Sequence, residues 1–290
     1  MGGLSKEREV SLVTGEGCAA ALRTGGYEVE EVDVDRQIGR RLQEIAPDVC
    51  FNALHGPFGE DGSIQGLLNY LNIPYTHSGV AASALAMDKS ITKLIANQLD
   101  IRTPNGKLVD ANSFWRSDLS APYVIKPIND GSSIDTYVVR DTNSLPFRKD
   151  QWPFAGGALL ETFIAGRELT VTVLDDRPLT VTEIVPAHAF YNFQAKYAPG
   201  GSRHILPAPV PTQVFEECQE SALRMHRTLG CRGISRSDFI LDDRSGRPIF
   251  LELNTQPGMT PTSLSPEQAG HVGIQFPQLV DILVRLARTD

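Results

Sequence analysis

The feature that most constrains this chain is a pair of apolar segments near the C-terminus that carry regularly spaced polar residues, GISRSDFIL and PIFLELN. Both segments have the composition and length of β-strands. Because side chains alternate along a strand, Arg236 and Asp238 share one face, and so do Glu252 and Asn254. Carboxylates within an apolar strand are costly to bury without partners. The two strands therefore predict a polar site on one face of a sheet.

The residue types at this site suit a hard divalent cation. Asp238, Glu252 and Asn254 supply carboxylate and amide oxygens, which Mg²⁺ accepts while it keeps water and phosphate oxygens as further ligands. The alternative is a solvated edge of the sheet with no metal. The apolar surroundings of Glu252 and Asn254 favour the metal site.

A glycine- and serine-rich loop at residues 129–133 follows a predicted strand at residues 123–127, which contains Lys126. Such a loop directs backbone N–H groups and hydroxyls at phosphate oxygens, and the lysine adds positive charge. Many loops of this composition are only turns, so this motif alone leaves both interpretations open.

A second glycine-rich loop, HGPFGEDG at residues 55–62, follows the predicted buried strand at residues 48–54. In α/β proteins the carboxyl ends of strands are where ligands bind, and glycine lets a backbone approach closely. The loop, with His55 at its start, is either part of a binding site or an ordinary turn.

Helices and strands alternate along the first part of the chain, which predicts a mostly parallel sheet. We expect Ser5 to cap the first helix and the Gly25–Gly26 pair to end it. No strand precedes the glycines at positions 2 and 3, so a neighbouring strand would be unpaired and Glu7 would lose support. The elements expected next are strands at 27–34, 48–54 and 73–76 and helices at 40–45 and 63–71.

The rest of the chain predicts helices and strands of a mixed fold. Helices are expected at 89–99, 211–229 and 276–287, and strands at 123–127, 136–139, 158–164, 168–174, 179–185, 233–241 and 248–253, with a polar loop at 191–204.

Composition excludes several functional classes. The net charge of −8 and the pI near 5.3 argue against nucleic acid or anionic membrane as a partner. No apolar run approaches the ~18 residues of a spanning helix, and no signal peptide is visible. The four cysteines are scattered without a CxxC pair, as in a reducing compartment, so we expect a cytoplasmic protein.

Six segments taken together resemble the D-alanine–D-alanine ligase family of the ATP-grasp superfamily. They are GGLSKEREVSL, HGPFGEDGSIQG, SGVAASALAMDKSITK, VIKPINDGSS, FYNFQAKY and LELNTQPGMTPTSL, in this order over essentially the whole chain. The resemblance implies a fold of mixed α/β and α+β type. A Rossmann-like pre-ATP-grasp domain (1–88, its first strand apparently missing) is followed by two ATP-grasp subdomains (89–165 and 166–290). It also implies a homodimer that makes D-alanyl-D-alanine for peptidoglycan synthesis through an acyl phosphate.

The resemblance further implies a role for each matching residue. Two Mg²⁺ ions, which Mn²⁺ can replace, would be held by Asp238, Glu252 and Asn254. ATP would be bound by Lys89, Lys126, Ser132, Ser133, Glu161, the backbone at Ile164, Glu168 and Lys196. The first D-alanine would be bound by Glu7 and His55, although a structural role for His55 is equally open. The second would be bound by Ser263 and Leu264. Arg236 and the backbone of Gly258 would stabilise the oxyanion, and Tyr197 and Ser132 would join a closing loop to Glu7.

The chain departs from the family's pattern at Asp135, where glycine is usual, at Thr162, where a basic residue is common, and at Ser235, which looks harmless. An aspartate beside phosphate is unfavourable by about 1–4 kcal/mol. Two other interpretations stay open: a weakly active or non-catalytic ATP-binding homologue, and an ATP-grasp ligase with a different acceptor. The Lys196–Tyr197 pair favours the dipeptide product, because D-lactate-using members tend to have histidine in place of Tyr197.

Overall fold

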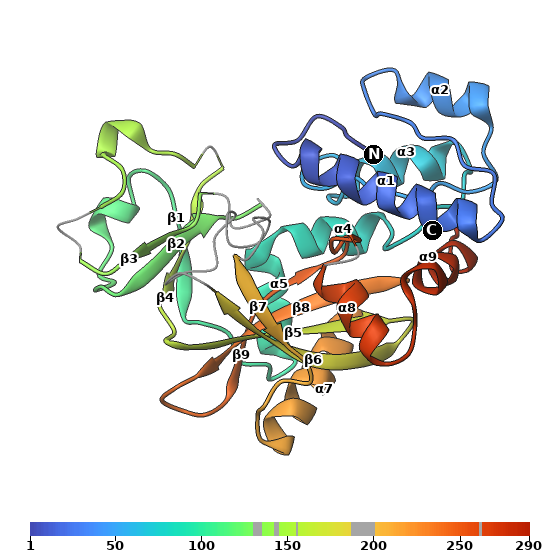
Figure 1. The fold of residues 1–290 in the computed structure, drawn as a ribbon. Coiled ribbons are helices and arrows are strands. Elements are labelled where there is room, and N and C mark those ends of the chain that lie inside the picture. Colours follow the sequence, from blue (N-terminus) through green and yellow to red (C-terminus); the bar gives the residue numbers. More distant parts are fainter. Residues whose placement is uncertain (130–134, 142–144, 155, 187–200, 261–262) are drawn as a thin grey trace.

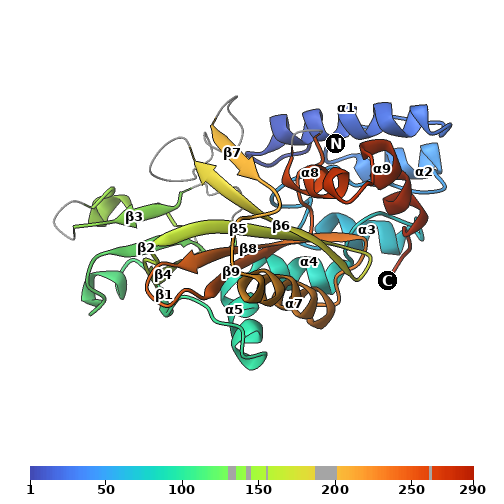
Figure 2. The same ribbon diagram turned by 60° about the horizontal axis from the view of Figure 1, so that its bottom comes forward.

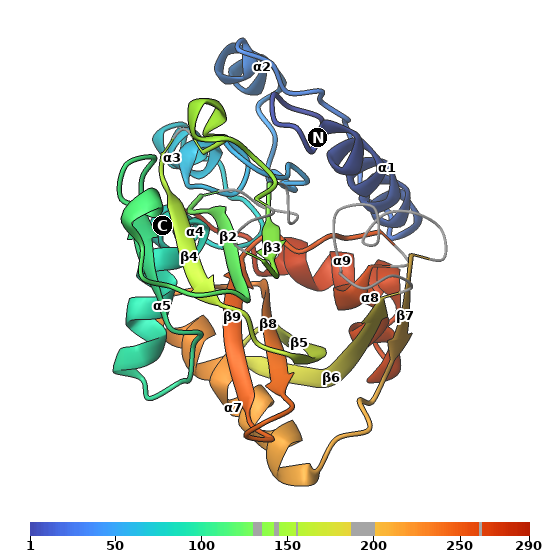
Figure 3. The same cartoon turned by 90° about the vertical axis from the view of Figure 1, so that its left-hand side faces the viewer.

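The computed structural model describes residues 1–129, 135–141, 145–154, 156–186, 201–260 and 263–290. Figure 1 shows an N-terminal helical region, a small four-stranded sheet and a larger five-stranded sheet. Viewed from the side of the four-stranded sheet, the helices α1 and α2 lie above both sheets (Figure 3). No helix within the described part of the chain is long and apolar enough to cross a membrane.

The N-terminal region, all of which the structure describes, contains the three helices that the sequence predicts and one parallel β-bridge. The helices are α1 (Arg8–Thr24), α2 (Ile38–Ile45) and α3 (Ser63–Tyr70). The prediction of strands at 27–34, 48–54 and 73–76, and of a mostly parallel sheet formed by them, is wrong. Cys50 forms one parallel bridge with Tyr75, and the pairing ends where the Thr76 hydroxyl accepts the Asn52 backbone N–H at 3.0 Å. A side chain thus takes the hydrogen bond that would extend the ladder.

Two expectations about the chain start are also wrong. Helix α1 begins after Glu7, and Ser5 does not cap it. The Ser5 hydroxyl instead accepts from the Glu7 backbone N–H at 3.1 Å and donates to the His55 carbonyl at 2.6 Å. Met1 hydrogen-bonds through its backbone with Val32 and Val34, alongside the 27–34 segment. Glu7 is 5 % exposed, so it is held in place rather than left without support.

The four-stranded sheet is antiparallel, with the order β1-β4-β2-β3. Its core is a cluster of aromatic rings in edge-to-face and tilted contact, including Phe114, Phe147, Trp152 and Phe154. The elements are β1 (Gly106–Val109), β2 (Tyr123–Pro127), β3 (Tyr137–Val139), β4 (Ala158–Thr162) and two 3₁₀ helices, Phe114–Arg116 and Lys149–Gln151.

The five-stranded sheet is antiparallel with the order β7-β6-β5-β8-β9 and forms the centre of the molecule. Helices α4, α5 and α7 cover one face, while α8 and α9 lie on the other side (Figure 2). Helix α9 also packs against α1 of the N-terminal region. The strands are β5 (Gly166–Leu174), β6 (Arg177–Pro186), β7 (Ser202–Ile205), β8 (Ile234–Asp242) and β9 (Pro248–Asn254). The helices are α4 (Val80–Met87), α5 (Lys89–Gln98), α7 (Thr212–Thr228), α8 (Leu264–His271) and α9 (Phe276–Arg285).

Most of these elements agree with the sequence within a few residues, but α4, α8, β1 and β7 were not expected. The division of the chain at residues 88 and 165 stays a prediction. Helix α5 shares its apolar core with the five-stranded sheet, through residues such as Ala96.

A β-bulge at the pair β8–β9 separates the core from the polar face. Phe239 lies opposite Phe250, but Asp238 lies opposite Glu252, so β9 has one extra residue, Leu251. Strict alternation would place Phe250 and Glu252 on the same face. The extra residue lets Phe250 enter the core, where it is fully buried, while Glu252 faces the opposite side.

Candidate active site

A cavity of about 990 Å³ lies between α1, the four-stranded sheet and the face of the five-stranded sheet opposite α7. Every predicted binding, catalytic or metal-ligating residue that the structure describes lines this cavity. These are Glu7, His55, Lys89, Lys126, Glu161, Ile164, Glu168, Arg236, Asp238, Glu252, Asn254, Gly258, Ser263 and Leu264. The predicted residues Ser132, Ser133, Lys196 and Tyr197 lie outside the described residues. Segments distant in sequence therefore converge on one site.

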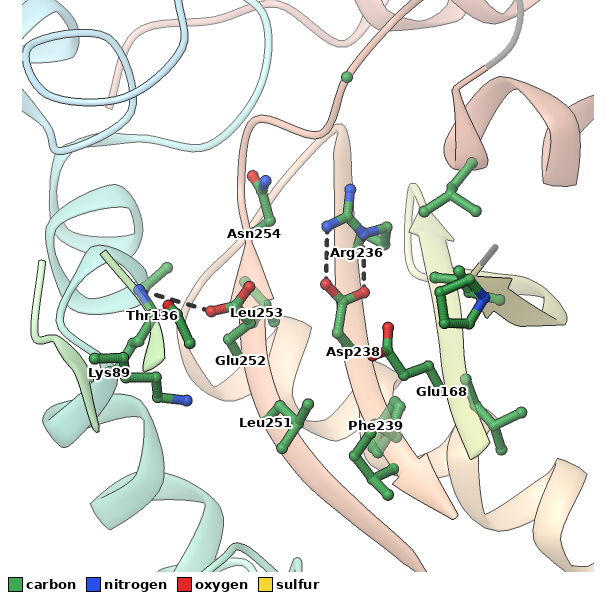
Figure 4. Close-up of a pocket in the computed structure, with 18 of the residues that line it drawn as sticks. Lys89, Thr136, Glu168, Arg236, Asp238, Phe239, Leu251, Glu252, Leu253 and Asn254 are labelled. Atoms are coloured by element: carbon green, nitrogen blue, oxygen red, sulfur yellow. Dashed lines mark hydrogen bonds and ion pairs between the residues drawn. The ribbon is translucent and has the colours of Figure 1, made fainter. Parts of the chain in front are cut away.

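The polar residues of β8 and β9, which the sequence predicts to share a face within each strand, form cross-strand pairs in the structure. Arg236 lies opposite Asn254, and Asp238 lies opposite Glu252. Figure 4 shows these four side chains on neighbouring strands, with Glu168 of β5 beside Asp238. Directly opposed residues in an antiparallel pair project to the same face. The face of the sheet that borders the cavity is therefore rich in carboxylates.

Each of the two carboxylates is held by a cation. The Arg236 guanidinium donates two hydrogen bonds to Asp238, at 2.9 and 2.8 Å, and the Lys89 ammonium lies 3.6 Å from Glu252 (Figure 4). The Thr170 hydroxyl donates to Asp238 at 2.6 Å. Charge-assisted and bidentate bonds of this kind fix side-chain orientation. The carboxylates are thus positioned before any ligand enters.

The donor set fits magnesium in its chemistry. Within the described ranges there is no group of three or more His, Cys, Asp or Glu side chains that could hold a metal ion. The expected set has a different composition, two carboxylates from Asp238 and Glu252 with the amide of Asn254. Mg²⁺ commonly takes one or two carboxylates and fills its other positions with water and substrate phosphates.

On the opposite wall, one buried glutamate contacts two lysines. Glu161 on β4 is 2 % exposed, and its carboxylate lies 2.8 Å from the Lys126 ammonium and in direct contact with the Lys93 ammonium. Lys126 is on the neighbouring strand β2, and Lys93 comes from α5. Burial and the adjacent Lys126 charge lower the pKa of Lys93. This wall therefore presents a fixed, ionic hydrogen-bonding group beside Ile164.

The N-terminal side of the cavity contains two buried carboxyl groups. Glu60 accepts the Gly56 backbone N–H at 3.0 Å, and burial together with the charge of Glu7 raises the pKa of Glu60 to about 8. One proton shared between two such groups removes like-charge repulsion. His55 lies close by, 3.0 Å from the Thr14 hydroxyl, and burial lowers its pKa to about 4, so its ring is neutral at pH 7. This corner suits a small cationic group.

The connection from β9 to α8 completes the site. Gly258 lines the cavity, and Ser263 precedes the first residue of α8, Leu264. The Ser263 hydroxyl accepts the Thr260 backbone N–H at 3.2 Å and lies 2.7 Å from the Thr260 hydroxyl. A helix N-terminus with backbone N–H groups nearby favours an anionic group.

Comparisons with known proteins identify the family. The model of the D-Ala–D-Ala ligase C-terminus matches residues 103–285, and that of the N-terminus matches residues 37–78. A D-alanine–D-alanine ligase of Rhizobium meliloti is 49 % identical over 292 residues, covering 98 % of this chain and 95 % of the relative. One of Ruegeria is 53 % identical over 293 residues, covering 98 % and 93 %.

The ligase of Bacillus anthracis, solved in complex with ATP, superposes with a TM-score of 0.83 at 31 % identity and covers 99 % of this chain and 94 % of its own. The chain belongs to the D-alanine–D-alanine ligase family. Its fold is the ATP-grasp fold of that family, as the sequence predicts.

The structure shows the surroundings of the three residues that depart from the D-alanine–D-alanine ligase pattern. Asp135 points toward the N-terminal region, where its carboxylate lies 3.4 Å from the Lys6 ammonium. Its φ of 54° is in the left-handed region that glycine favours. Ser235 donates to or accepts from the buried His226 ring at 2.7 Å. Thr162 ends β4 and lines the cavity.

Sequence reasoning missed three residues of the site. Lys93 lies one helical turn after Lys89 within the quoted motif, so its shared face was a usable signal. Glu60 belongs to the HGPFGEDG loop but was not singled out. Gln256 had no signal, because its contacts are with a segment about 200 residues away.

Proposed function

We propose that the protein joins two D-alanines into D-alanyl-D-alanine, a peptidoglycan precursor, with ATP as the phosphoryl donor and ADP and phosphate as products. The observation that carries this proposal is the convergence of the described family residues on one cavity. That cavity has paired cations and carboxylates on one wall and a buried ionic cluster on the other.

In the first step, a carboxylate oxygen of the first D-alanine attacks the γ-phosphorus of ATP. The bond from that phosphorus to the β,γ-bridging oxygen breaks, so ADP leaves and D-alanyl phosphate forms. Lys89 and Lys126, with Lys196, would neutralise phosphate charge, while Glu7 would bind the ammonium of D-alanine. Phosphoryl transfer of this kind depends mainly on positioning and charge neutralisation.

The nucleotide base and sugar would lie on the opposite wall. Glu161 would accept a hydrogen bond from the adenine amino group, the backbone at Ile164 would contact the ring, and Glu168 would bind the ribose hydroxyls. The loop with Ser132 and Ser133 would bind phosphate oxygens.

In the second step, the free amine of the second D-alanine attacks the carbonyl carbon of the acyl phosphate. The tetrahedral oxyanion would be stabilised by Arg236 and the Gly258 N–H, and the carbon–oxygen bond to phosphate then breaks. The amine loses one proton as the amide forms. Ser263 and Leu264 would bind the second carboxylate, and Tyr197 with Ser132 and Glu7 would close the site against water.

Asp238, Glu252 and Asn254 would hold two Mg²⁺ ions, or Mn²⁺ in their place, which would neutralise charge on the β- and γ-phosphates. Lys89 contacts Glu252 and Arg236 contacts Asp238. These two contacts fix the orientation of both carboxylates.

We place the enzyme in the cytoplasm as a homodimer, without nucleic acid or membrane as partner. The four cysteines, all of which are free thiols, support a reducing compartment, and the family resemblance supports the homodimer.

The test is quantification of D-alanyl-D-alanine and phosphate from ATP, Mg²⁺ and D-alanine, with wild type, Glu252→Gln and Glu44→Gln. Glu44 is an exposed carboxylate on α2, 3.6 Å from Arg40, and serves as the matched control. We expect equal amounts of dipeptide and phosphate from wild type and Glu44→Gln, and a loss of at least about 100-fold in Glu252→Gln.

ATP binding without phosphate release would favour the non-catalytic homologue. A product formed only with D-lactate or D-serine as second substrate would favour a different acceptor. Either result would contradict the proposal.

A further inference from the structure

A buried pair of amide side chains joins the two halves of the active site. Asn52 lies in the N-terminal region, and Gln256 lies in the connection between β9 and α8; they are 5 % and 1 % exposed. The Gln256 side chain donates to the Asn52 backbone carbonyl, and the Asn52 side chain donates to the Gln256 side-chain oxygen at 3.4 Å. The contact is therefore reciprocal and excludes water.

Further hydrogen bonds fix Asn52 itself. Its amide nitrogen also donates to the Gly59 carbonyl at 2.9 Å, and its amide oxygen accepts the Leu54 N–H at 3.1 Å. The side chain thus holds the two ends of the segment that carries His55. Buried amides satisfied in this way are rigid, and an unsatisfied one is costly.

Gln256 also contacts the end of strand β9. Its backbone N–H donates to the Asn254 side-chain oxygen at 2.7 Å, and its backbone also hydrogen-bonds with the His55 ring. Two positions further along the chain is Gly258. One residue is consequently bonded to the end of β9 and to the N-terminal corner with Glu7 and Glu60.

We propose that Gln256 is a positioning residue that keeps the loop carrying Gly258 in register with the corner that binds the first substrate, through its hydrogen bonds with Asn52. The inference rests on the proposed function, because the acyl phosphate formed at that corner must be held against Gly258 and Arg236. A displacement of about 1 Å can reduce such a reaction about 100-fold. Water then competes with the second amine for the acyl phosphate.

Gln65 offers a matched control. It is also a buried glutamine, 1 % exposed, and it donates to the same Gly59 carbonyl at 2.9 Å, but this hydrogen bond lies within the N-terminal region. Gln256→Leu and Gln65→Leu therefore remove similar groups from similar surroundings, and only the first breaks the contact between the two halves.

The experiment measures phosphate released per dipeptide formed, together with kcat and the KM for ATP. We expect a ratio near one for wild type and Gln65→Leu. For Gln256→Leu we expect a ratio of about three or more and a dipeptide kcat lower by about 10- to 100-fold, with the KM for ATP changed by less than about twofold. Loss of packing alone would lower the amount of folded enzyme without altering this ratio.

Two additional measurements keep the inference falsifiable. Asn52→Ala removes the side-chain hydrogen bond with Gln256 but keeps the backbone carbonyl that accepts from Gln256. It must still raise the ratio, and the double variant must be less impaired than the product of the two single effects, because both variants remove the same side-chain hydrogen bond. Amide hydrogen exchange of residues 251–258, measured without substrates, must increase in Gln256→Leu and not in Gln65→Leu. A ratio that stays near one with unchanged exchange would overturn the inference. If wild type makes no dipeptide, the function fails, while exchange still decides whether Gln256 holds the loop.

Discussion

Removal of the buried carboxylate of Glu161 gives a prediction with a calculable size. Glu161→Gln keeps the shape of the side chain but replaces the carboxylate that contacts both Lys93 and Lys126. Its side chain is 3 % exposed, so water cannot substitute for the lost charge. Removing one member of a buried ionic group costs about 3–5 kcal/mol.

A more exposed carboxylate that also contacts two cations is the control for Glu161→Gln. Glu217 lies 2.8 Å from Arg102 and 3.0 Å from Arg247, so it too contacts two cations, but its side chain is 22 % exposed and solvent screens it. We expect Glu217→Gln to cost about 1 kcal/mol or less.

Urea unfolding at pH 7.5 without nucleotide measures the difference. Both tryptophans, Trp115 and Trp152, lie in the region of the four-stranded sheet that contains Glu161, so their fluorescence reports its unfolding. With a slope of about 2 kcal/mol per molar urea, the midpoint should fall by about 2 M for Glu161→Gln. Circular dichroism should show a fall of about 0.5 M or less for Glu217→Gln.

The loss should change little between pH 7.5 and pH 9, because burial lowers the pKa of Lys93 to about 6, below both pH values. Equal shifts for the two variants, or a shift below about 0.5 M for Glu161→Gln, would refute the electrostatic reasoning.

Two further predictions concern stability. Burial lowers the pKa of His226 from 6.5 to about 4, so the unfolded chain binds more protons between these values and the folded state loses stability as the pH falls through the window. Between pH 7.5 and 5 this amounts to about 2 kcal/mol, and His226→Gln should reduce the slope of unfolding free energy against pH by about one proton; an unchanged slope would contradict the assignment. Arg232 donates to the His77 and Arg288 carbonyls at 2.9 and 2.6 Å, and its guanidinium lies 4.7 Å from the Tyr75 ring. Arg232→Met should therefore lower the free energy of unfolding in urea by about 2–3 kcal/mol and leave the turnover per folded molecule unchanged. Loss of turnover without loss of stability would be the contrary result.

The sequence predicted the polar face of β8 and β9 because alternation along a strand is a local rule. Arg236 and Asp238 therefore share a face as expected, and so do Glu252 and Asn254, whereas their cross-strand pairing is known only from the structure. The same rule fails at Leu251, since a bulge depends on how Phe250 packs against Phe239 in the core rather than on any local signal.

The N-terminal region shows the limit of pattern reasoning about strands. The alternation of helices and strands predicted a mostly parallel sheet, but Cys50 and Tyr75 form a parallel bridge only, and a hydroxyl of Thr76 ends their pairing there. Contacts of high sequence separation, such as Asn52 with Gln256 and Glu161 with Lys93, depend on the assembled fold. Neither periodicity nor motif spacing contains that information.

The most direct test of the proposed chemistry follows an oxygen atom. D-Alanine labelled with ¹⁸O in its carboxylate is incubated with the enzyme, ATP and Mg²⁺, and the released phosphate is analysed by mass spectrometry. Attack of the carboxylate on the γ-phosphorus predicts one ¹⁸O in each phosphate and one retained in the new amide carbonyl. Phosphate without ¹⁸O, formed together with dipeptide, would contradict an acyl phosphate and the account built on it.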